Sequence, residues 1–151
     1  MEILKVTENK KKYFDLLILA DEDEKMIDAY LERGDMYVLT EGEKAVGTIV
    51  VTDEGDGVLE IKNIATDPAM QGKGCGRKMI NYVEEQYAGR YTTLLVGTGD
   101  SPLTVPFYEK CGFVRSHIIP NFFTDNYDHP IVECGVTLRD MVYLKKSIKE
   151  N

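Results

Sequence analysis

The stretch that decides the fold is residues 63–78, which read NIATDPAMQGKGCGRK. It starts as a β-type segment, turns at Asp67-Pro68, passes through a loop with alternate glycines from Gly72 to Gly76, and continues as a helix. Alternate glycines let backbone N–H groups approach a ligand closely, and the start of a helix carries partial positive charge. Three basic side chains make residues 71–78 locally +3 in a chain of net charge −8. The stretch predicts a phosphate site, although a tight turn that binds nothing needs the same glycines.

This glycine loop fits one known pattern and departs from two others. No GxxxxGK[ST] run occurs, and the third glycine falls one residue early for the dinucleotide pattern GxGxxG. Gln71, Gly74 and Gly76 instead meet the pattern Gln or Arg-x-x-Gly-x-Gly or Ala. Together with the Pro turn before the loop and the segment FYEKCGF at residues 107–113, they closely resemble the GNAT superfamily of acetyl-coenzyme A dependent N-acetyltransferases.

The resemblance implies a fold, a ligand and the residues that bind it. The fold is of the α/β (α+β) class, with a mixed, mostly antiparallel central sheet, flanking helices, and a parallel pair of strands, 58–66 and 91–96, that splay apart to hold coenzyme A. The motifs cover residues 58–114, and the order of elements extends the match to a single domain over 1–151. Acetyl-coenzyme A is then the co-substrate. The residues implied in binding it are Ile64, Ala65, Thr66, Gln71, Gly72, Lys73, Gly74, Cys75, Gly76, Arg77 and Ser101.

Hydrophobic periodicity gives a similar order of elements without the resemblance. We expect strands over 2–6, 36–40, 45–52, 58–66, 91–96, 113–123 and 136–145, and helices over 9–20, 21–34 and 75–87, with a shorter helix around Tyr108 that Pro106 shortens or kinks. The strands between 36 and 66 form a meander, whereas the crossover helix 75–87 makes strands 58–66 and 91–96 parallel. Residues 124–135 form a loop whose length suits either a functional role or a solvated connection.

Length, charge and composition limit the class of protein. With 151 residues, 43% of them hydrophobic, the chain suits one domain with a sizeable core. Its net charge of −8 opposes binding to nucleic acid. No apolar run near the start approaches the ~20 residues of a membrane span, and Met1–Lys5 lacks the features of a secretion signal, so we expect no membrane association and a cytoplasmic location. Three scattered cysteines and two histidines twelve residues apart predict no metal site.

The resemblance also assigns the chemistry, in which an amine attacks the thioester directly. It implies Tyr108 as the general acid for the coenzyme A sulfur, since a tyrosine of pKa about 10 is still protonated when a thiolate of pKa ~8.5 departs. A backbone N–H near Ile64 or Ala65 would hold the carbonyl oxygen. Glu60 is the candidate general base, for which it needs burial or a water relay. The alternatives are a packed core tyrosine at 108 and a surface carboxylate at 60 paired with Lys62.

Several functions stay open from the sequence. The leading hypothesis is a cytoplasmic acyltransferase that moves acetyl to a primary amine of a small molecule or peptide. A non-catalytic acyl-coenzyme A binding module and a structural domain that dimerises through its C-terminal strands are the alternatives. Acidic runs such as 21–24 and 53–56 favour a cationic acceptor, but they equally suit a solvated face. The amine, the length of the acyl group and whether the chain forms a homodimer stay undecided.

Overall fold

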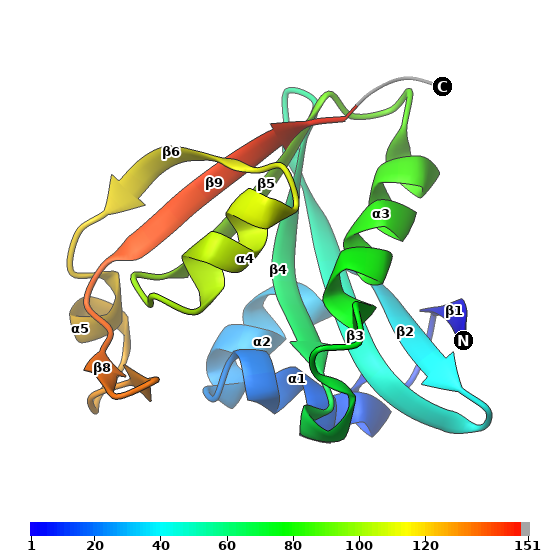
Figure 1. The fold of residues 1–151 in the computed structure, drawn as a ribbon, viewed down its shortest axis with the longest axis horizontal. Coiled ribbons are helices and arrows are strands. Elements are labelled where there is room, and N and C mark those ends of the chain that lie inside the picture. The colour runs from blue at the N-terminus through cyan, green and yellow to red at the C-terminus, as the bar shows by residue number, and fades with distance from the viewer. Residues whose placement is uncertain (149–151) are drawn as a thin grey trace. The chain divides into compact units, whose positions relative to one another are not determined.

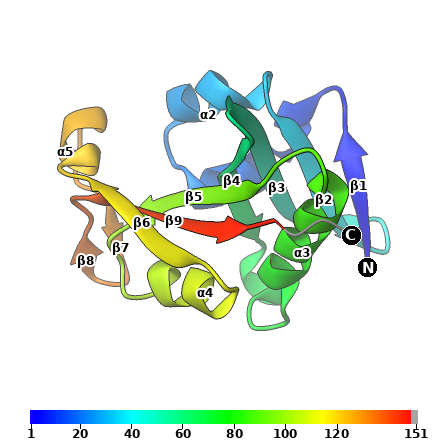
Figure 2. The same ribbon diagram turned by 90° about the horizontal axis from the view of Figure 1, so that it is seen from above.

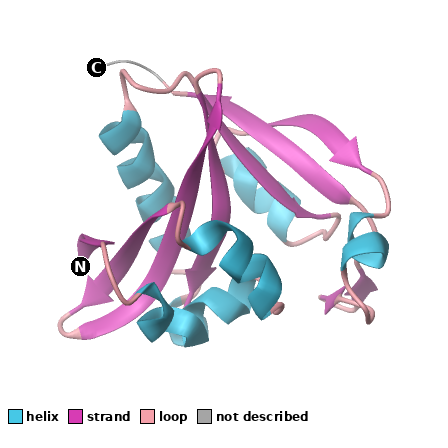
Figure 3. Ribbon diagram, turned by 180° about the vertical axis from the view of Figure 1, so that it is seen from behind, coloured by secondary structure: helices cyan, strands magenta, loops and turns pink. Residues whose placement is uncertain are grey.

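The computed structural model describes residues 1–148, which form two compact units: residues 1–92 with Ile148, and residues 93–147. Both units combine helices with strands (Figures 1 and 3), so the predicted mixed α/β class is confirmed. The paired strands within each unit run antiparallel. The expectation of a single domain over 1–151 stays a prediction.

The N-terminal unit is built on four consecutive strands: β1 (Glu2–Val6), β2 (Asp35–Glu41), β3 (Lys44–Gly55) and β4 (Val58–Thr66). Each pairs with the next, which confirms the predicted meander. β3 is longer than expected because Gly55 still pairs with Val58 beyond the acidic run at 53–56. The pairing of β3 with β4 shifts where Val50 faces Asn63 and Val51 faces Ile61, which makes Lys62 an extra, bulged residue.

Helices cover both faces of these strands. The short 3-10 helix η1 (Lys10–Tyr13), α1 (Phe14–Ala20) and α2 (Glu24–Leu31) belong to one face, and α3 (Cys75–Tyr87) lies on the other (Figure 2). Alternate residues of β2 contact the helices on opposite faces, since successive side chains along a strand point to opposite faces. Met36 and Val38 pack in one buried cluster with residues of α1 and α2, whereas the ring of Tyr37 contacts Tyr82 of α3.

Two predicted helices of this unit differ from the structure in their limits. The single helix expected over 9–20 is a 3-10 turn followed by α1, and its start at Asn9 has a left-handed backbone with φ of 53°. The second helix starts at Glu24 rather than at residue 21, because the Asp23 side chain caps it by accepting a hydrogen bond from the Lys25 N–H. It ends at Leu31, whose carbonyl accepts a hydrogen bond from the buried Lys10 ammonium at 2.9 Å.

The C-terminal unit has a central strand with one neighbour on each side. Here β9 (Met141–Ser147) pairs with β5 (Thr93–Gly99) and with β6 (Val114–Ile119), while β7 (Val132–Glu133) and β8 (Val136–Thr137) form a small separate hairpin. The helices are α4 (Thr104–Lys110) and α5 (Phe122–Asn126). Pro106 does not interrupt α4, because it is the third residue of the helix, where backbone N–H groups have no intrahelical partner in any case.

The predictions for the end of the chain are partly wrong. The strand expected over 113–123 stops at Ile119, since Pro120 has no N–H to donate and Asn121 takes a left-handed backbone that starts α5. The strand expected over 136–145 is split into β8 and β9 by residues 138–140, whose backbone bonds elsewhere: the Leu138 N–H donates to the Ile131 carbonyl. The expected loop over 124–135 includes the end of α5 and all of β7.

Candidate active site

The end of β4 turns sharply into the glycine loop. The Asp67 N–H donates to the Val46 carbonyl at 2.8 Å, which continues the pairing with β3 past the end of the strand. The Asp67 carboxylate then accepts a hydrogen bond from the Ala69 N–H at 2.9 Å and caps the 3-10 turn η2 (Pro68–Met70). This turn leads from the expected pantetheine-binding strand to the expected pyrophosphate-binding loop within four residues.

The glycines of the loop differ in whether their backbone conformation requires glycine. Gly72 and Gly74 both have φ of +78°, a conformation that other residues rarely adopt, and a Cβ at either position would meet nothing within 4 Å. Backbone conformation, and not crowding by the protein, selects glycine there. Gly74 is the N-cap of α3, and its carbonyl accepts the Lys78 N–H at 3.0 Å. Gly76 lies inside the first turn of α3, where the backbone is ordinary helix.

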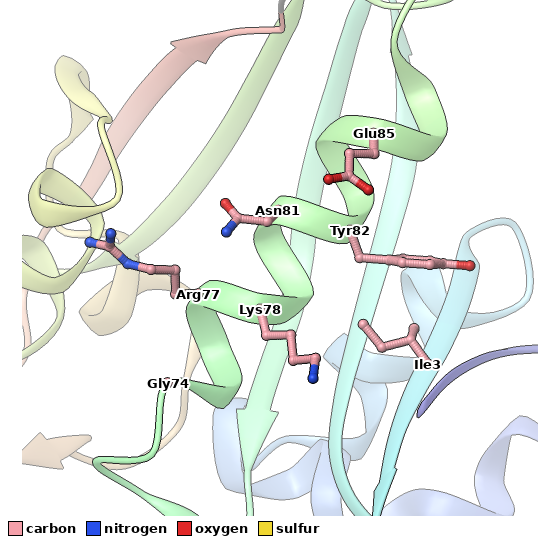
Figure 4. A pocket seen from close by; sticks show the side chains of 7 residues that line it. All are labelled: Ile3, Gly74, Arg77, Lys78, Asn81, Tyr82 and Glu85. Atoms are coloured by element: carbon pink, nitrogen blue, oxygen red, sulfur yellow. The ribbon is translucent and has the colours of Figure 1, made fainter. Parts of the chain in front are cut away.

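A shallow groove of about 400 Å³ extends from the loop along α3. Figure 4 shows its lining side chains: Arg77 and Asn81 point to one side of the helix, and Tyr82 points to the other, toward Ile3. Gly74, Arg77 and Lys78 belong both to this groove and to the start of α3. The first turn of α3 and two basic side chains thus lie at the end of the groove nearest the loop, which suits an anionic ligand there, whereas Glu85 lines the groove further along the helix.

The other predicted binding residues of this unit are placed beside the loop. Ala65 and Cys75 are buried, and Ile64 and Thr66 are half-buried. The Cys75 thiol lies 3.7 Å from the Met70 carbonyl, a contact that packs the start of α3 on the preceding turn. Lys73 is exposed, with its ammonium 3.9 Å from the Met70 sulfur.

Glu60 is a buried carboxylate on β4. Burial raises its pKa, and the neighbouring Lys62 ammonium, 3.1 Å from Oε2, opposes that rise. Nearby Glu54 raises the Glu60 pKa further. The burial that a general base of this type needs is therefore present. Four residues of strand separate Glu60 from Ile64, a span of about 13 Å, so the carboxylate does not reach the backbone at Ile64 without intervening water.

Asn63 is a residue of this strand that the sequence did not single out. It is only 3% exposed, and its Nδ2 donates to the Leu17 carbonyl of α1 at 2.9 Å and to the Tyr30 hydroxyl of α2 at 3.0 Å. One amide thus joins both helices to the strand directly before Ile64. Its Oδ1 is buried and has no hydrogen-bond partner in residues 1–148. The signal in the sequence is a polar residue inside a strand that is covered on both faces.

The C-terminal unit carries the predicted general acid. Tyr108 is buried on α4, with its ring edge-on to Phe107 and to Phe113 at centroid distances of 5.1 and 5.7 Å. Burial, and to a lesser extent Cys111, raises the pKa of Tyr108 above its usual value, so the phenol stays protonated at neutral pH. Ser101 is also buried, and its Oγ accepts a hydrogen bond from the Leu103 N–H at 3.0 Å, which supports the turn before α4.

Comparison with known proteins identifies the family. A model of the acetyltransferase (GNAT) domain matches residues 32–115, more than half of the chain. The chain belongs to the GNAT acetyltransferase family. Its relatives include YvbK of Bacillus subtilis (strain 168), described as an uncharacterized N-acetyltransferase, which is 36% identical over 139 residues, or 91% of this chain and 90% of the relative.

Two solved structures of the GNAT family are similar over 97% of both chains. A GNAT acetyltransferase from Elizabethkingia anophelis with acetyl-CoA bound has 34% identity and a TM-score of 0.91. A Bacillus subtilis acetyltransferase in complex with CoA has 34% identity and a TM-score of 0.88. The resemblance drawn from the glycine loop and the predicted acyltransferase class are therefore confirmed.

Metal ligands and membrane spans give two further findings for the part of the chain that the structure describes. Among residues 1–148, no three His, Cys, Asp or Glu side chains come together in a group that could hold a metal ion. No helix in the same range has the length and apolar character to cross a membrane.

Proposed function

We propose that this GNAT protein transfers the acetyl group of acetyl-coenzyme A to a primary amine of a small molecule or a peptide, by direct attack of the amine on the thioester. The observation that supports it most is the glycine loop at the start of α3, where left-handed glycines, helix N–H groups and a local charge of +3 fit a pyrophosphate in an otherwise acidic chain. The bound acetyl-CoA and CoA of the two similar structures support the same ligand.

Acetyl-coenzyme A is assigned to the N-terminal unit as follows. The backbone amides of residues 71–77 bind the pyrophosphate, with Lys73 and Arg77 adding charge. The backbone of residues 64–66 pairs with the pantetheine arm, because the N–H and carbonyl groups of a strand can form hydrogen bonds with an extended chain that contains amides. A backbone N–H at Ile64 or Ala65 holds the carbonyl oxygen as negative charge develops on it. Ser101 stays in the proposed binding set from the family resemblance.

The proton steps are assigned to Tyr108 and Glu60. The amine nitrogen forms a bond to the acetyl carbon, the carbon–sulfur bond breaks, and the Tyr108 phenol gives its proton to the departing thiolate. Glu60 receives the proton of the amine through water, since its distance along β4 excludes direct contact with an amine at Ile64. Its raised pKa makes it a better base than an exposed carboxylate.

Neither Cys75 nor Cys111 suits the role of nucleophile in a covalent acyl-enzyme. Cys75 and Cys111 are buried, and Cys75 packs against a backbone carbonyl. A nucleophilic cysteine needs a neighbouring base that lowers its pKa. Direct transfer uses the groups already described and needs neither thiol.

An amine screen with detection of free thiol tests the activity. We expect release of coenzyme A thiol that depends on an added primary amine, together with a mass increase of the amine by one acetyl group. Binding of acetyl-coenzyme A without amine-dependent release would instead favour the alternative of a non-catalytic acyl-coenzyme A binding module. Longer acyl-coenzyme A substrates in the same screen show whether acetyl is the preferred group.

A negative chain carrying acidic runs favours cationic acceptors within this class. We place the reaction in the cytoplasm, where acetyl-coenzyme A is available to such an enzyme. Salt is the simplest check on the charge argument. If long-range attraction assists binding, the KM for the amine rises with ionic strength while the turnover number changes little.

A further inference from the structure

Two buried polar atoms on neighbouring strands of the N-terminal unit have no hydrogen-bond partner anywhere in the described range 1–148. They are Thr48 Oγ1 on β3 and Asn63 Oδ1 on β4. Thr48 is 0% exposed and Asn63 is 3% exposed. Buried polar groups in folded proteins are nearly always paired, because an unpaired hydroxyl or amide oxygen loses its hydrogen bonds to water and gains none. The missing partner of these two atoms is therefore a small molecule that the fold encloses.

The direction of the Asn63 amide follows from the partners of its nitrogen. The Leu17 carbonyl can only accept a hydrogen bond, so Nδ2, 2.9 Å from it, is the atom of the amide that faces α1. Nδ2 also donates to the Tyr30 hydroxyl at 3.0 Å. Both hydrogens of the amide are used in these bonds, and Oδ1 has to accept its own hydrogen bond from another donor.

Thr48 and Asn63 lie on the same face of the strands. In the pairing of β2, β3 and β4, Thr48 is opposite Val38, and Val50 is opposite both Met36 and Asn63. Val38, Val50 and Met36 pack in the buried cluster with α1 and α2, and residues opposite each other in paired strands share a face. Thr48 and Asn63 are thus diagonal neighbours, with Cβ atoms about 7 Å apart. A single water between their side chains can bond to both.

This diagonal lies between the two places that the proposed proton transfer must join. On the same face of the two strands, Glu60 is opposite Thr52 and Ala65 is opposite Thr48. Asn63 comes between Glu60 and Ala65 along β4. The two unpartnered atoms therefore lie within the span of about 13 Å between Glu60 and the backbone at Ile64, which the carboxylate does not cross by itself.

We propose that Thr48 and Asn63 hold a buried water molecule that carries the proton of the amine toward Glu60. The Thr48 hydroxyl donates to this water, and the water donates one hydrogen to Asn63 Oδ1. One lone pair and one hydrogen of the water are left, which suits a molecule that makes three or four hydrogen bonds.

The remaining lone pair and hydrogen complete the proton step. An N–H bond of the amine breaks, its proton passes to the water, and the water gives up its other hydrogen as a proton that forms an O–H bond on Glu60. The water is unchanged at the end. Thr48 and Asn63 are positioning residues, because they act through the water. The transfer rests on the proposed function, whereas the water site rests on the two unpartnered atoms.

A high-resolution crystal structure of the full chain tests the water site without any activity. We expect one water about 3 Å from both Thr48 Oγ1 and Asn63 Oδ1. Thr48→Val gives a second readout, because valine keeps the shape of threonine and removes the hydroxyl. The melting temperature should decrease, since the water and Asn63 Oδ1 lose a partner. Absence of the water, or the rise in melting temperature expected when an unpaired buried hydroxyl is replaced, would overturn the site.

Kinetics of variants tests the proton path. Thr48→Val should lower kcat about tenfold, with the affinity for acetyl-coenzyme A and the KM for the amine changed by no more than a few fold. Thr48→Ser keeps the hydroxyl and should retain most of kcat. In the double variant Thr48→Val with Glu60→Gln, kcat should equal that of Glu60→Gln alone, because both changes interrupt one path. Effects that multiply in the double variant would assign Thr48 a purely structural role and overturn the path.

Thr40→Val is the matched control, because the Thr40 hydroxyl on β2 already donates to the Glu2 carbonyl at 3.4 Å. It should leave kcat unchanged, and a loss like that of Thr48→Val would reject the assignment. If Thr48→Val does not fold, Thr48→Ala against Thr48→Ser makes the same comparison of a missing and a present hydroxyl.

The outcomes separate this inference from the proposed function. Unchanged kcat in Thr48→Val, in an enzyme that Glu60→Gln impairs, would reject the path and leave the proposed function standing. If the wild type transfers no acetyl group to any amine, the proposed function fails and the path fails with it. The crystal structure and the melting temperature then still decide whether Thr48 and Asn63 hold a water.

Discussion

The two units of this protein differ in how far their strands are buried. In the N-terminal unit, strands β2 to β4 have helices on both faces, and most of their side chains are buried. In the C-terminal unit, β6 is exposed along its whole length. The covered unit carries the glycine loop, which must hold a fixed backbone shape, whereas the open unit carries the proposed general acid and the exposed strand β6.

Tyr108→Phe gives the largest expected effect and tests whether the C-terminal unit contributes chemistry. The variant keeps the aromatic ring and its contacts with Phe107 and Phe113. Turnover should decrease about a hundredfold or more, as is typical when a general acid is lost, while the affinity for coenzyme A changes by no more than a few fold. Steady-state kinetics and calorimetry measure the two quantities. Tyr13→Phe, a half-buried tyrosine of the N-terminal unit, is the control and should keep full turnover.

Glu60→Gln should have the next largest effect. Removal of the buried base should lower kcat about tenfold to a hundredfold at neutral pH, without weakening coenzyme A binding. The exposed turn residue Glu43 offers a matched control, and Glu43→Gln should have no effect on kcat. Unchanged kcat in Glu60→Gln would show that this carboxylate serves the structure of β4 and that water alone takes the proton.

Gly76→Val separates binding by the glycine loop from stability of the fold. Gly76 has ordinary helical backbone, so valine is not disfavoured there and the melting temperature should not decrease. Its branched side chain should crowd the pyrophosphate and weaken coenzyme A binding about tenfold, or about 1.4 kcal/mol. Gly76→Ala, which the family pattern permits, should bind normally. A Val variant that binds as well as the wild type would place the pyrophosphate elsewhere.

Tyr30→Phe tests the amide that joins the two helices to β4. The substitution removes one of the two acceptors of the Asn63 Nδ2 and keeps the bond to the Leu17 carbonyl. We expect the free energy of unfolding to decrease by about 1 kcal/mol. Urea denaturation measures this change, and an unchanged midpoint would indicate that water replaces the hydroxyl at no cost.

Lys62→Met should give a small shift in pH dependence. The Lys62 ammonium lowers the pKa of Glu60 and opposes the effect of burial, so its removal should raise that pKa further. A base must be deprotonated to act, and the acidic limb of kcat should therefore move to higher pH. A limb that stays in place, or moves to lower pH, would mean that Glu60 does not control it.

Regular burial, more than membership of one unit, explains which elements the sequence could predict. Periodicity located β1 to β4 and α3 well, because strands and a helix with a covered face repeat their apolar residues at a fixed spacing. It gave wrong limits around β6, α5 and β8 and for the first two helices of the N-terminal unit. The backbone there is decided by single residues such as Asp23, Pro120 and Asn121. Local spacing holds little information about such segments.

The candidate site was predictable only in part, for a similar reason. The glycine loop is contiguous in sequence. Its resemblance to the family pattern therefore predicted both the loop and the start of α3. Asn63 could not be assigned a role, because its partners Leu17 and Tyr30 lie 46 and 33 residues away and become neighbours only in the fold. The burial that raises the pKa of Glu60 likewise depends on tertiary packing.

Calorimetric titration of acetyl-coenzyme A into the wild-type protein tests the central claim most directly. The claim is that the loop between β4 and α3 exists to hold this ligand. We predict saturable heat with one molecule bound per chain, and loss of most of that affinity in Gly76→Val at an unchanged melting temperature. A folded wild-type protein that gives no heat at high micromolar ligand, and whose melting temperature does not rise with the ligand, would contradict the claim.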